Sequence, residues 1–243
     1  MRKLLLPVFF SLSSLSLFSI AQAETVHFTT EEYPPFNYRD GKTPAGATVE
    51  QVEKIMSDIG VDYSIDVMPW VRAYTQAQTT PMTCVFATAH NDARDKLFKW
   101  VLPLLVDRNI LIKHTGSNVT ATTVDEARNY LVGTWRDDYT ETTLRQANFT
   151  RIDIGSDFKA TLKKLMSDRI DLMPISEIYF DKLEKDRIAV QEVGVLSEQP
   201  MGIACQKDFP DDLLKKMQAA LNRLIADGTQ KQIFLKYGLH LAN

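Results

Sequence analysis

The side chain in this sequence best suited to binding a small anion is Arg94. It follows an apolar, strand-like run at 84–87 and lies in a polar stretch that begins at Thr88. Polar residues just after a sheet strand often hold ligands in α/β proteins. A guanidinium in such a place can grip a carboxylate through two parallel hydrogen bonds. The same pattern also fits an arginine on a solvated helix, so the residue alone leaves both interpretations open.

Aromatic residues follow two other predicted strands. Tyr33 lies in a loop that two prolines fix after the first strand, and Trp70 and Arg72 follow the strand predicted at 63–67. Open parallel sheets place ligands at the carboxyl ends of their strands, where all three would lie. We therefore expect them to share a cleft with Arg94, although Trp70 would also suit an ordinary core position.

Motifs for metal binding, nucleophilic catalysis or phosphate binding are not found in the sequence. The four histidines are scattered without the spacing of a metal site, and we expect surface or core positions for them: His27, His90, His114 and His240. His90 alone is close enough to Arg94 to reach the cleft. The sequence therefore favours binding without a metal or a cofactor.

The elements that must position these residues alternate between strands and helices. The first part predicts strands at 26–30, 63–67, 83–88 and 109–113, and helices at 49–59 and 70–78. The second part predicts strands at 131–135, 151–154 and 170–174. It also predicts one helix that starts at 122, another that follows the first of these strands and ends near 147, and two more at 157–167 and 176–184. The chain closes with a β-like stretch at 202–205 and helices at 211–226 and 229–237. This order predicts α/β units with mostly parallel sheets flanked by helices.

The first 23 residues have the features of an export signal. Arg2 and Lys3 precede an apolar run at 4–20, and Ala21-Gln22-Ala23 suits a cleavage site near Ala23. No later stretch is long and apolar enough to span a bilayer. Without the two signal cations, 26 basic residues face 31 acidic ones, a net charge of −5. We expect a periplasmic protein, and its charge argues against nucleic acid or anionic lipid as a partner.

The two cysteines, Cys84 and Cys205, are far apart in sequence. An oxidising compartment would permit a disulfide between them. Bridge formation needs closely spaced Cβ atoms, which sequence does not reveal. We expect the disulfide, with two buried free thiols as the alternative.

Several short motifs in a fixed order resemble one known family. They are Tyr-Pro-Pro-Phe after the first strand, Gly46 before a helix, the Arg94 turn followed by 98–103, the Gly202-Ile203-Ala204 return, and a last helix from Gly228-Thr229 to Tyr237-Gly238. Together they resemble the family 3 extracellular solute-binding proteins, the periplasmic amino-acid-binding proteins and their relatives. The stretch from Pro69 to Ala73 looks like a divergent branch of that family.

The resemblance implies a two-lobed fold, known as the type II periplasmic-binding-protein-like fold. Each lobe has a central, mostly parallel sheet flanked by helices, and two crossing strands join the lobes around a trapped ligand. We expect the signal at 1–23, one lobe from 24–106 and 202–243, and the other from 107–201. We also expect a monomer.

The resemblance also implies roles for individual residues. Arg94 stands where the family grips the ligand's α-carboxylate, and Asn91 stands where a threonine is usual. Tyr33 and Trp70 match aromatic positions that flank the ligand. The full ligand-binding set that we expect is Tyr33, Trp70, Arg72, Thr88, Asn91, Arg94, Arg136, Asp138 and Ser176.

Two departures from the family concern the ligand's amine. Aspartates that hold this amine in relatives correspond to Thr30 and Ser176 here, and the stretch 136–139 replaces a glycine-threonine turn. An ammonium group without a carboxylate partner in a closed cleft would cost several kcal/mol. Either Glu31, Asp138 or Glu177 takes over this role, or the ligand is not an ordinary α-amino acid.

These observations predict a binding protein that performs no reaction. It would capture a small polar, carboxylate-bearing ligand for an ABC-type permease. One alternative is that the protein reports ligand binding to a membrane sensor in place of a permease. Another is an enzyme similar to cyclohexadienyl dehydratases, with Glu177 or Asp138 as the general acid.

Overall fold

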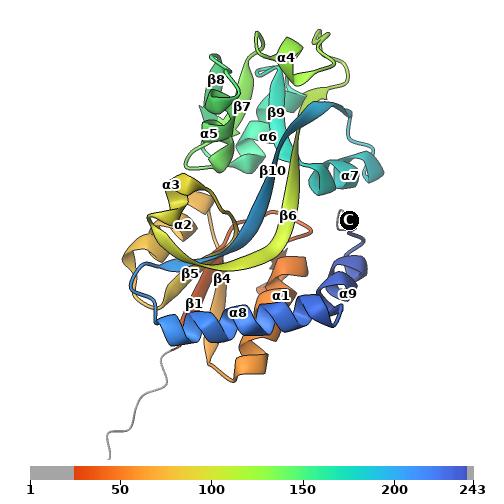
Figure 1. The fold of residues 1–243 in the computed structure, drawn as a ribbon. Helices are drawn as coiled ribbons and strands as arrows, with labels where there is room; N and C mark the ends of the chain where they lie inside the picture. Colours follow the sequence, from red (N-terminus) through yellow and green to blue (C-terminus); the bar gives the residue numbers. More distant parts are fainter. Residues whose placement is uncertain (1–24, 240–243) are drawn as a thin grey trace, which may run out of the picture.

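Two long strands, β6 (Phe98–His114) and β10 (Val190–Gln206), run side by side through the middle of the protein (Figure 1). The computed structural model describes residues 25–239, so the expected export signal lies outside the described residues. Strands β6 and β10 pair in antiparallel fashion and join all the larger strands into one sheet, in the order β4-β1-β5-β10-β6-β9-β7-β8.

One end of this sheet belongs to what we call the β1 half. Its strands are β1 (Val26–Thr30), β4 (Tyr63–Val67) and β5 (Thr83–Ala89), and its helices are α1 (Ala47–Ile59), α2 (Trp70–Thr79), α3 (Asp92–Asp95), α8 (Asp211–Ala226) and α9 (Thr229–Lys236). A small hairpin, β2 (Tyr38–Asp40) and β3 (Thr43–Ala45), lies before α1. Strand β1 pairs in parallel with β4 and β5, so the carboxyl ends of these three strands share one edge.

The other end of the sheet belongs to what we call the β7 half. Its strands are β7 (Val132–Trp135), β8 (Ile152–Gly155) and β9 (Leu172–Ser176), and its helices are α4 (Val124–Ala127), α5 (Tyr139–Gln146), α6 (Phe158–Met166) and α7 (Glu177–Lys185). Strand β7 is parallel to both β8 and β9. The predicted α/β architecture with helices flanking a mostly parallel sheet is therefore confirmed.

Apolar periodicity accounts for the helices that cover the sheet. In α1 the side chains of Val52, Ile55 and Met56 are fully buried against Phe28 and Phe86 of the sheet. An amphipathic helix of this kind gains its stability from the buried stripe. Within the described residues, no helix combines the length and apolar character needed to cross a membrane.

Two glycines permit close backbone approaches that matter for the site. Gly46, before α1, has a φ of 123°, and a Cβ there would lie 2.2 Å from the carbonyl oxygen of Phe36. Gly202 sits at an irregularity of β10, and its Cβ would lie 2.6 Å from the carbonyl oxygen of Val101. Only glycine allows the loop after β1 and the crossing strands to pack this tightly.

The predicted disulfide between Cys84 and Cys205 is confirmed. The two residues lie directly opposite each other on the antiparallel strands β5 and β10, with Cα atoms 3.9 Å apart and sulfurs 2.08 Å apart. The bridge therefore links the start of β5 to the end of the returning crossing strand β10.

The crossing strands are much longer than the sequence predicted. In the sequence, strand-like patterns are limited to 109–113 and 202–205. The reason is that the pattern of buried and exposed residues along β6 and β10 changes at the point where these strands pass from one half to the other. Helix α3, which carries Arg94, contains only four residues. Residues 98–103, which follow it, belong to β6.

Candidate functional site

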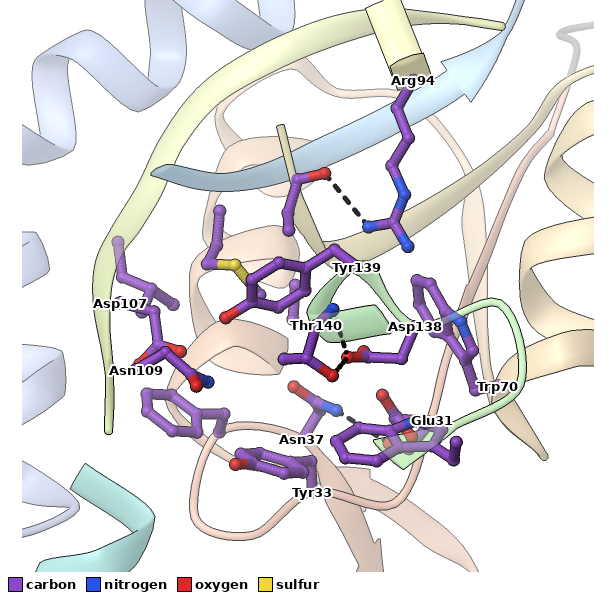
Figure 2. Close-up of a pocket in the computed structure, with 16 residues that line it drawn as sticks. Glu31, Tyr33, Asn37, Trp70, Arg94, Asp107, Asn109, Asp138, Tyr139 and Thr140 are labelled. Carbon is purple, nitrogen blue, oxygen red and sulfur yellow. Dashed lines mark hydrogen bonds between the residues drawn. The ribbon is translucent and has the colours of Figure 1, made fainter. Parts of the chain in front are cut away.

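A cavity of about 50 Å³ lies between the two halves. That volume would hold on the order of four water molecules. The polar and aromatic side chains that line it come from the β1 half (Glu31, Tyr33, Phe36, Asn37, Trp70 and Arg94), from β6 (Asp107 and Asn109) and from the β7 half (Trp135, Asp138, Tyr139 and Thr140). Figure 2 shows the residues that it labels, among them Arg94, Asp107 and Asp138, arranged around one space. Both halves and a crossing strand therefore build the site.

The sheet topology explains why these residues meet. Glu31 follows β1, Trp70 opens α2 just after β4, and Arg94 lies in α3 just after β5. Asp138 follows β7 in the same way and caps α5, since its side chain accepts a hydrogen bond from the backbone of Thr140. Carboxyl ends of parallel strands in the two halves thus face one another across the cavity.

Arg94 is only 5% exposed and is held from several sides. Its Nη1 donates to the carbonyl oxygen of Ala89 at 3.1 Å, and its Nη2 donates to the carbonyl oxygen of Asp137 at 2.8 Å. The guanidinium carbon lies 5.3 Å from the ring centre of Trp70 and 5.1 Å from that of Tyr74. A guanidinium has five N–H donors, so these two bonds leave donors for a ligand.

The two predicted aromatic residues both make contacts between the halves. Trp70 is 4% exposed, and its Nε1 donates to the same Asp137 carbonyl at 3.0 Å. The hydroxyl oxygen of Tyr33 accepts a hydrogen bond from the backbone N–H of Ser176 at 3.1 Å. The Tyr33 ring also packs edge-on against Phe158 at 4.8 Å between ring centres. These contacts describe a closed arrangement.

Three carboxyl groups line the cavity against the single guanidinium. Burial raises the pKa of Asp107 to about 7, although a hydrogen bond from the Ser176 hydroxyl at 2.5 Å opposes this shift. Burial also raises the pKa of Glu31 well above its ordinary value, with Asp138 adding to the shift and Arg94 opposing it. The pKa of Asp138 is raised by burial as well. The cavity therefore has more acidic than basic groups.

Three buried polar atoms at the cavity make no hydrogen bond within the described part of the chain. They are Asn109 Oδ1, Trp135 Nε1 and the hydroxyl of Tyr139. Burial, together with the charges of Asp107 and Asp138, raises the pKa of Tyr139 well above its usual value, so this hydroxyl stays protonated. Buried polar groups in proteins are normally paired, which indicates a polar ligand here.

The structure brings together only part of the predicted ligand set. Tyr33, Trp70, Arg94 and Asp138 line the cavity, whereas Asn91 caps α3 by accepting a hydrogen bond from the Arg94 backbone. The remaining members do not line the cavity: Thr88 is buried and donates to the Val85 carbonyl, Ser176 lies behind Asp107, and Arg72 and Arg136 are exposed.

The sequence interpretation missed Asn37, Asp107, Asn109, Trp135, Tyr139 and Thr140. One signal was present, because Asp107 and Asn109 are polar residues two apart in the chain, which puts them on one face of a strand. Asn37 lies between β1 and β2, the others follow or end β7, and nothing in the sequence distinguishes these four from core residues. Glu177, considered as an amine partner, forms an ion pair with Arg108 and does not line the cavity.

No histidine lines the cavity among the residues the structure describes, and His240 lies outside them. His90 pairs with Asp95 at 2.6 Å, and His114 pairs with Asp168 at 2.9 Å. Across positions 25–239, no three His, Cys, Asp or Glu side chains are grouped closely enough to hold a metal ion.

Comparison with known proteins gives a family and a fold. The sequence profile described as bacterial extracellular solute-binding proteins, family 3, matches residues 26–240. No curated protein sequence matches the chain.

Three solved structures illustrate the similarity of the fold. An ancestral arginine-binding protein bound to arginine has a TM-score of 0.77 and 21% identity, covering 88% of this chain and 97% of that one. A histidine kinase sensor domain with similarity to periplasmic binding proteins has a TM-score of 0.79 and 16% identity, covering 88% and 95%. An ancestral amino-acid-binding protein, described as a precursor of cyclohexadienyl dehydratase, has a TM-score of 0.77 and 17% identity, covering 88% and 94%. At these identities the likeness shows the fold alone, and the resemblance seen in the sequence is confirmed.

Proposed function

Because the chain belongs to family 3 of the bacterial extracellular solute-binding proteins, we propose that it captures an amino acid or a related small carboxylate between its two halves. The observation that carries this proposal is a cavity with one guanidinium and several buried, unpaired polar atoms, contributed by both halves. Such a cavity suits a polar ligand that is fully enclosed when the halves meet.

Arg94 is the residue that we propose for the ligand's carboxylate. It is buried, its ring neighbours Trp70 and Tyr74 hold its plane, and it retains donors after its two carbonyl contacts. Trp135 Nε1 and the Tyr139 hydroxyl, from the β7 half, can donate to the same ligand only after closure. Each half thus contributes to binding, and the crossing strands β6 and β10 act as the hinge.

We propose that the protein works in the periplasm as a monomer after removal of residues 1–23. The lobes would then be 24–106 with 202–243, and 107–201. Delivery to an ABC-type permease is the favoured output, and reporting to a membrane sensor is the alternative. A sensor role gains support from the similarity to a histidine kinase sensor domain. Pull-down of the ligand-bound protein with the permease or sensor of its own genome would distinguish the two outputs.

A thermal-shift screen of the purified protein tests the binding function. Amino acids, dicarboxylates, polyamines and small aromatic acids are the compounds to include. A ligand present at 100 times its dissociation constant adds about 2.7 kcal/mol to the free energy of unfolding. For a chain of this size the expected rise in Tm is roughly 5–10 °C. The Arg94→Ala variant should lose this shift for carboxylate ligands, and a full response by the variant would refute the role of Arg94.

A dehydratase reaction is the second candidate function. It is favoured by one observation, a buried carboxyl group at Asp107 whose pKa of about 7 suits a general acid near neutral pH. Asp138 also lines the cavity, whereas Glu177 does not. The test is incubation of the protein with prephenate or arogenate. Formation of phenylpyruvate or phenylalanine would support the reaction, and absence of both products would exclude it.

A further inference from the structure

We propose that closing of the two halves is coupled to the uptake of one proton, which a carboxyl pair formed by Glu31 and Asp138 holds across the cavity. Glu31 follows β1 in the β1 half, Asp138 follows β7 in the β7 half, and both line the cavity. Figure 2 shows the two side chains close to each other, on the side of the space where Trp70 lies. Such a coupling exists in the protein without a ligand, so it does not depend on the proposed binding function.

The distance between these two carboxyl groups depends on closure, because they belong to different halves. The contacts that hold the halves together lie beside them. Arg94 Nη2 and Trp70 Nε1 both donate to the carbonyl oxygen of Asp137, the residue before Asp138. Opening at the crossing strands would break both bonds, move Asp138 away from Glu31 and admit water to each group. In the open form both groups therefore ionise near their ordinary pKa values, 4.5 for Glu31 and 3.8 for Asp138.

In the closed form one cation is not enough to keep both groups ionised. Among the cavity-lining residues within 25–239, Arg94 is the only one with a basic side chain, and it opposes the shift of both carboxyl groups. Burial outweighs it, since the pKa of Glu31 is raised well above its ordinary value by burial and by Asp138, and burial also raises the pKa of Asp138. Two buried carboxyl groups that face each other favour one retained proton.

Glu31 is the group that holds this proton. The Asp138 carboxylate accepts hydrogen bonds from the backbone N–H and the hydroxyl of Thr140, as the cap of α5, and both bonds stabilise its charge. Glu31 accepts from Asn37 through its backbone carbonyl, which leaves the carboxyl group unaffected, and burial is the largest influence on the pKa of that group. The pair therefore consists of a protonated Glu31 beside an ionised Asp138.

The other titratable groups around the pair do not cancel this coupling. From β6, Asp107 adds a further carboxyl group, whose pKa burial raises to about 7. Asp157, which caps α6, adds to the rise in the pKa of Glu31. Burial raises the pKa of the Tyr33 and Tyr139 hydroxyls well above the usual value, so both stay protonated. The groove outside Glu31 has equal numbers of acidic and basic side chains, namely Glu31, Glu32 and Asp157 with Arg39, Arg72 and Lys159.

The direction of the coupling follows from these shifts. The closed form has the higher pKa values, so it binds a proton that the open form releases. Low pH therefore favours closure, and closure weakens as the pH rises above the ordinary carboxyl values towards the raised ones. For one proton, the ratio of closed to open protein falls by up to about tenfold per pH unit within that window.

The test is small-angle X-ray scattering of the protein without ligand, at constant ionic strength, between pH 5 and pH 8. Unfolding in denaturant, dialysis and refolding remove any ligand that was bound during expression. The parent and the Trp70→Phe variant are both measured, because the variant lacks one contact between the halves and populates the open form more. We expect the radius of gyration to rise with pH. A constant radius of gyration in both proteins would overturn the inference.

Three further variants, made in the Trp70→Phe background, assign the effect. Glu31→Gln keeps the size of the side chain but cannot ionise, so it should stay closed up to pH 8. Asp138→Asn should do the same, because asparagine also caps helices. Glu32→Gln is the matched control, since Glu32 is the exposed neighbour and accepts from the Arg39 backbone, and it should follow the Trp70→Phe protein. If Glu31→Gln and Asp138→Asn both open with rising pH as the control does, other groups cause the effect and the inference is wrong.

Discussion

The Nη2 atom of Arg94 donates a hydrogen bond across the cavity to the backbone carbonyl of Asp137, at 2.8 Å. Asp137 has a φ of 60°, in the left-handed region, and its carbonyl also accepts from Trp70 Nε1 at 3.0 Å. The residue that we propose for the ligand's carboxylate therefore also holds the two halves together. Contacts within the protein therefore already stabilise the closed form, and a bound ligand would add further contacts to them.

Removal of one of these contacts should shift the protein toward an open form. Trp70→Phe keeps an aromatic ring beside Tyr74 but deletes the Nε1 donor to Asp137. The loss of one hydrogen bond is worth about 1 kcal/mol, or about a fivefold change in the ratio of closed to open protein. Small-angle X-ray scattering without ligand should show a larger radius of gyration.

Trp100→Phe is the matched control for this measurement. Trp100 is also in the crossing region, but its buried Nε1 has no hydrogen-bond partner among residues 25–239. Its replacement by phenylalanine should leave the radius of gyration unchanged. The same value for Trp70→Phe and Trp100→Phe would argue against a latch between the halves.

Arg94→Lys should weaken the binding of carboxylate ligands strongly, although the charge is retained. Lysine lacks the planar fork, so it cannot replace the two fixed carbonyl contacts and also grip a carboxylate. We expect a loss of affinity of roughly 30-fold or more in isothermal titration. Arg72→Lys, at an exposed position outside the cavity, should bind like the parent. Equal losses in both variants would contradict this assignment.

Asp107 should make the stability of the unliganded protein depend on pH. Its pKa is raised to about 7, from an ordinary value of 3.8, because burial and the nearby Asp138 and Glu177 disfavour the charge, while the Ser176 hydrogen bond opposes this. The folded state thus holds the proton more tightly than the unfolded state. The resulting stabilisation is fully present below pH 3.8 and is lost as the pH rises to about 7.

Denaturant unfolding between pH 4.5 and 8 measures this effect. Asp107→Asn should lose less stability than the parent as the pH rises, and it should be the more stable protein at pH 8, by a few kcal/mol. Glu177→Gln, which keeps Asp107, should retain most of the parent's pH dependence. Parallel curves for the parent and Asp107→Asn would show that Asp107 does not titrate in this range.

The Cys84–Cys205 bridge should contribute substantially to stability. It closes a sequence separation of 121 residues, and the loss of loop-closure entropy for such a loop amounts to about 5 kcal/mol in the chain-entropy model. Measured contributions of about 2–5 kcal/mol correspond to a lower Tm by roughly 4–20 °C for the Cys84→Ala/Cys205→Ala double variant. Unfolding in the presence of reductant should lower the Tm of the parent but leave the double variant unchanged.

Much of the fold could be predicted from the sequence because its signals are local. Apolar periodicity and β-branched runs predicted β1, β4 and α8 with the same bounds that the structure has. The rule that ligands meet the carboxyl ends of parallel strands was enough to single out Tyr33, Trp70 and Arg94. Each of these inferences needs only a residue and its immediate neighbours in the chain.

The middle of the crossing strands could not be predicted in the same way. In β6 and β10 the side chains pass from one half to the other, so neither strand keeps one pattern of burial along its 17 residues. Their length comes from pairing with each other, and pairing between residues about 90 positions apart leaves no local signal. The full extent of β6 thus remained hidden, and with it the position of Asp107 in the site.

By itself the sequence determined the family, the order of the elements and the arginine at the site. Only the tertiary structure decided which carboxyl groups face that arginine. Ser176 and Asp107 are 69 residues apart, yet they share a buried hydrogen bond, while Arg136 is exposed although it lies two residues from Asp138. The energy of a charge depends on the water removed around it and on its partners across the fold. Those partners are set by long-range packing, which residue spacing does not encode.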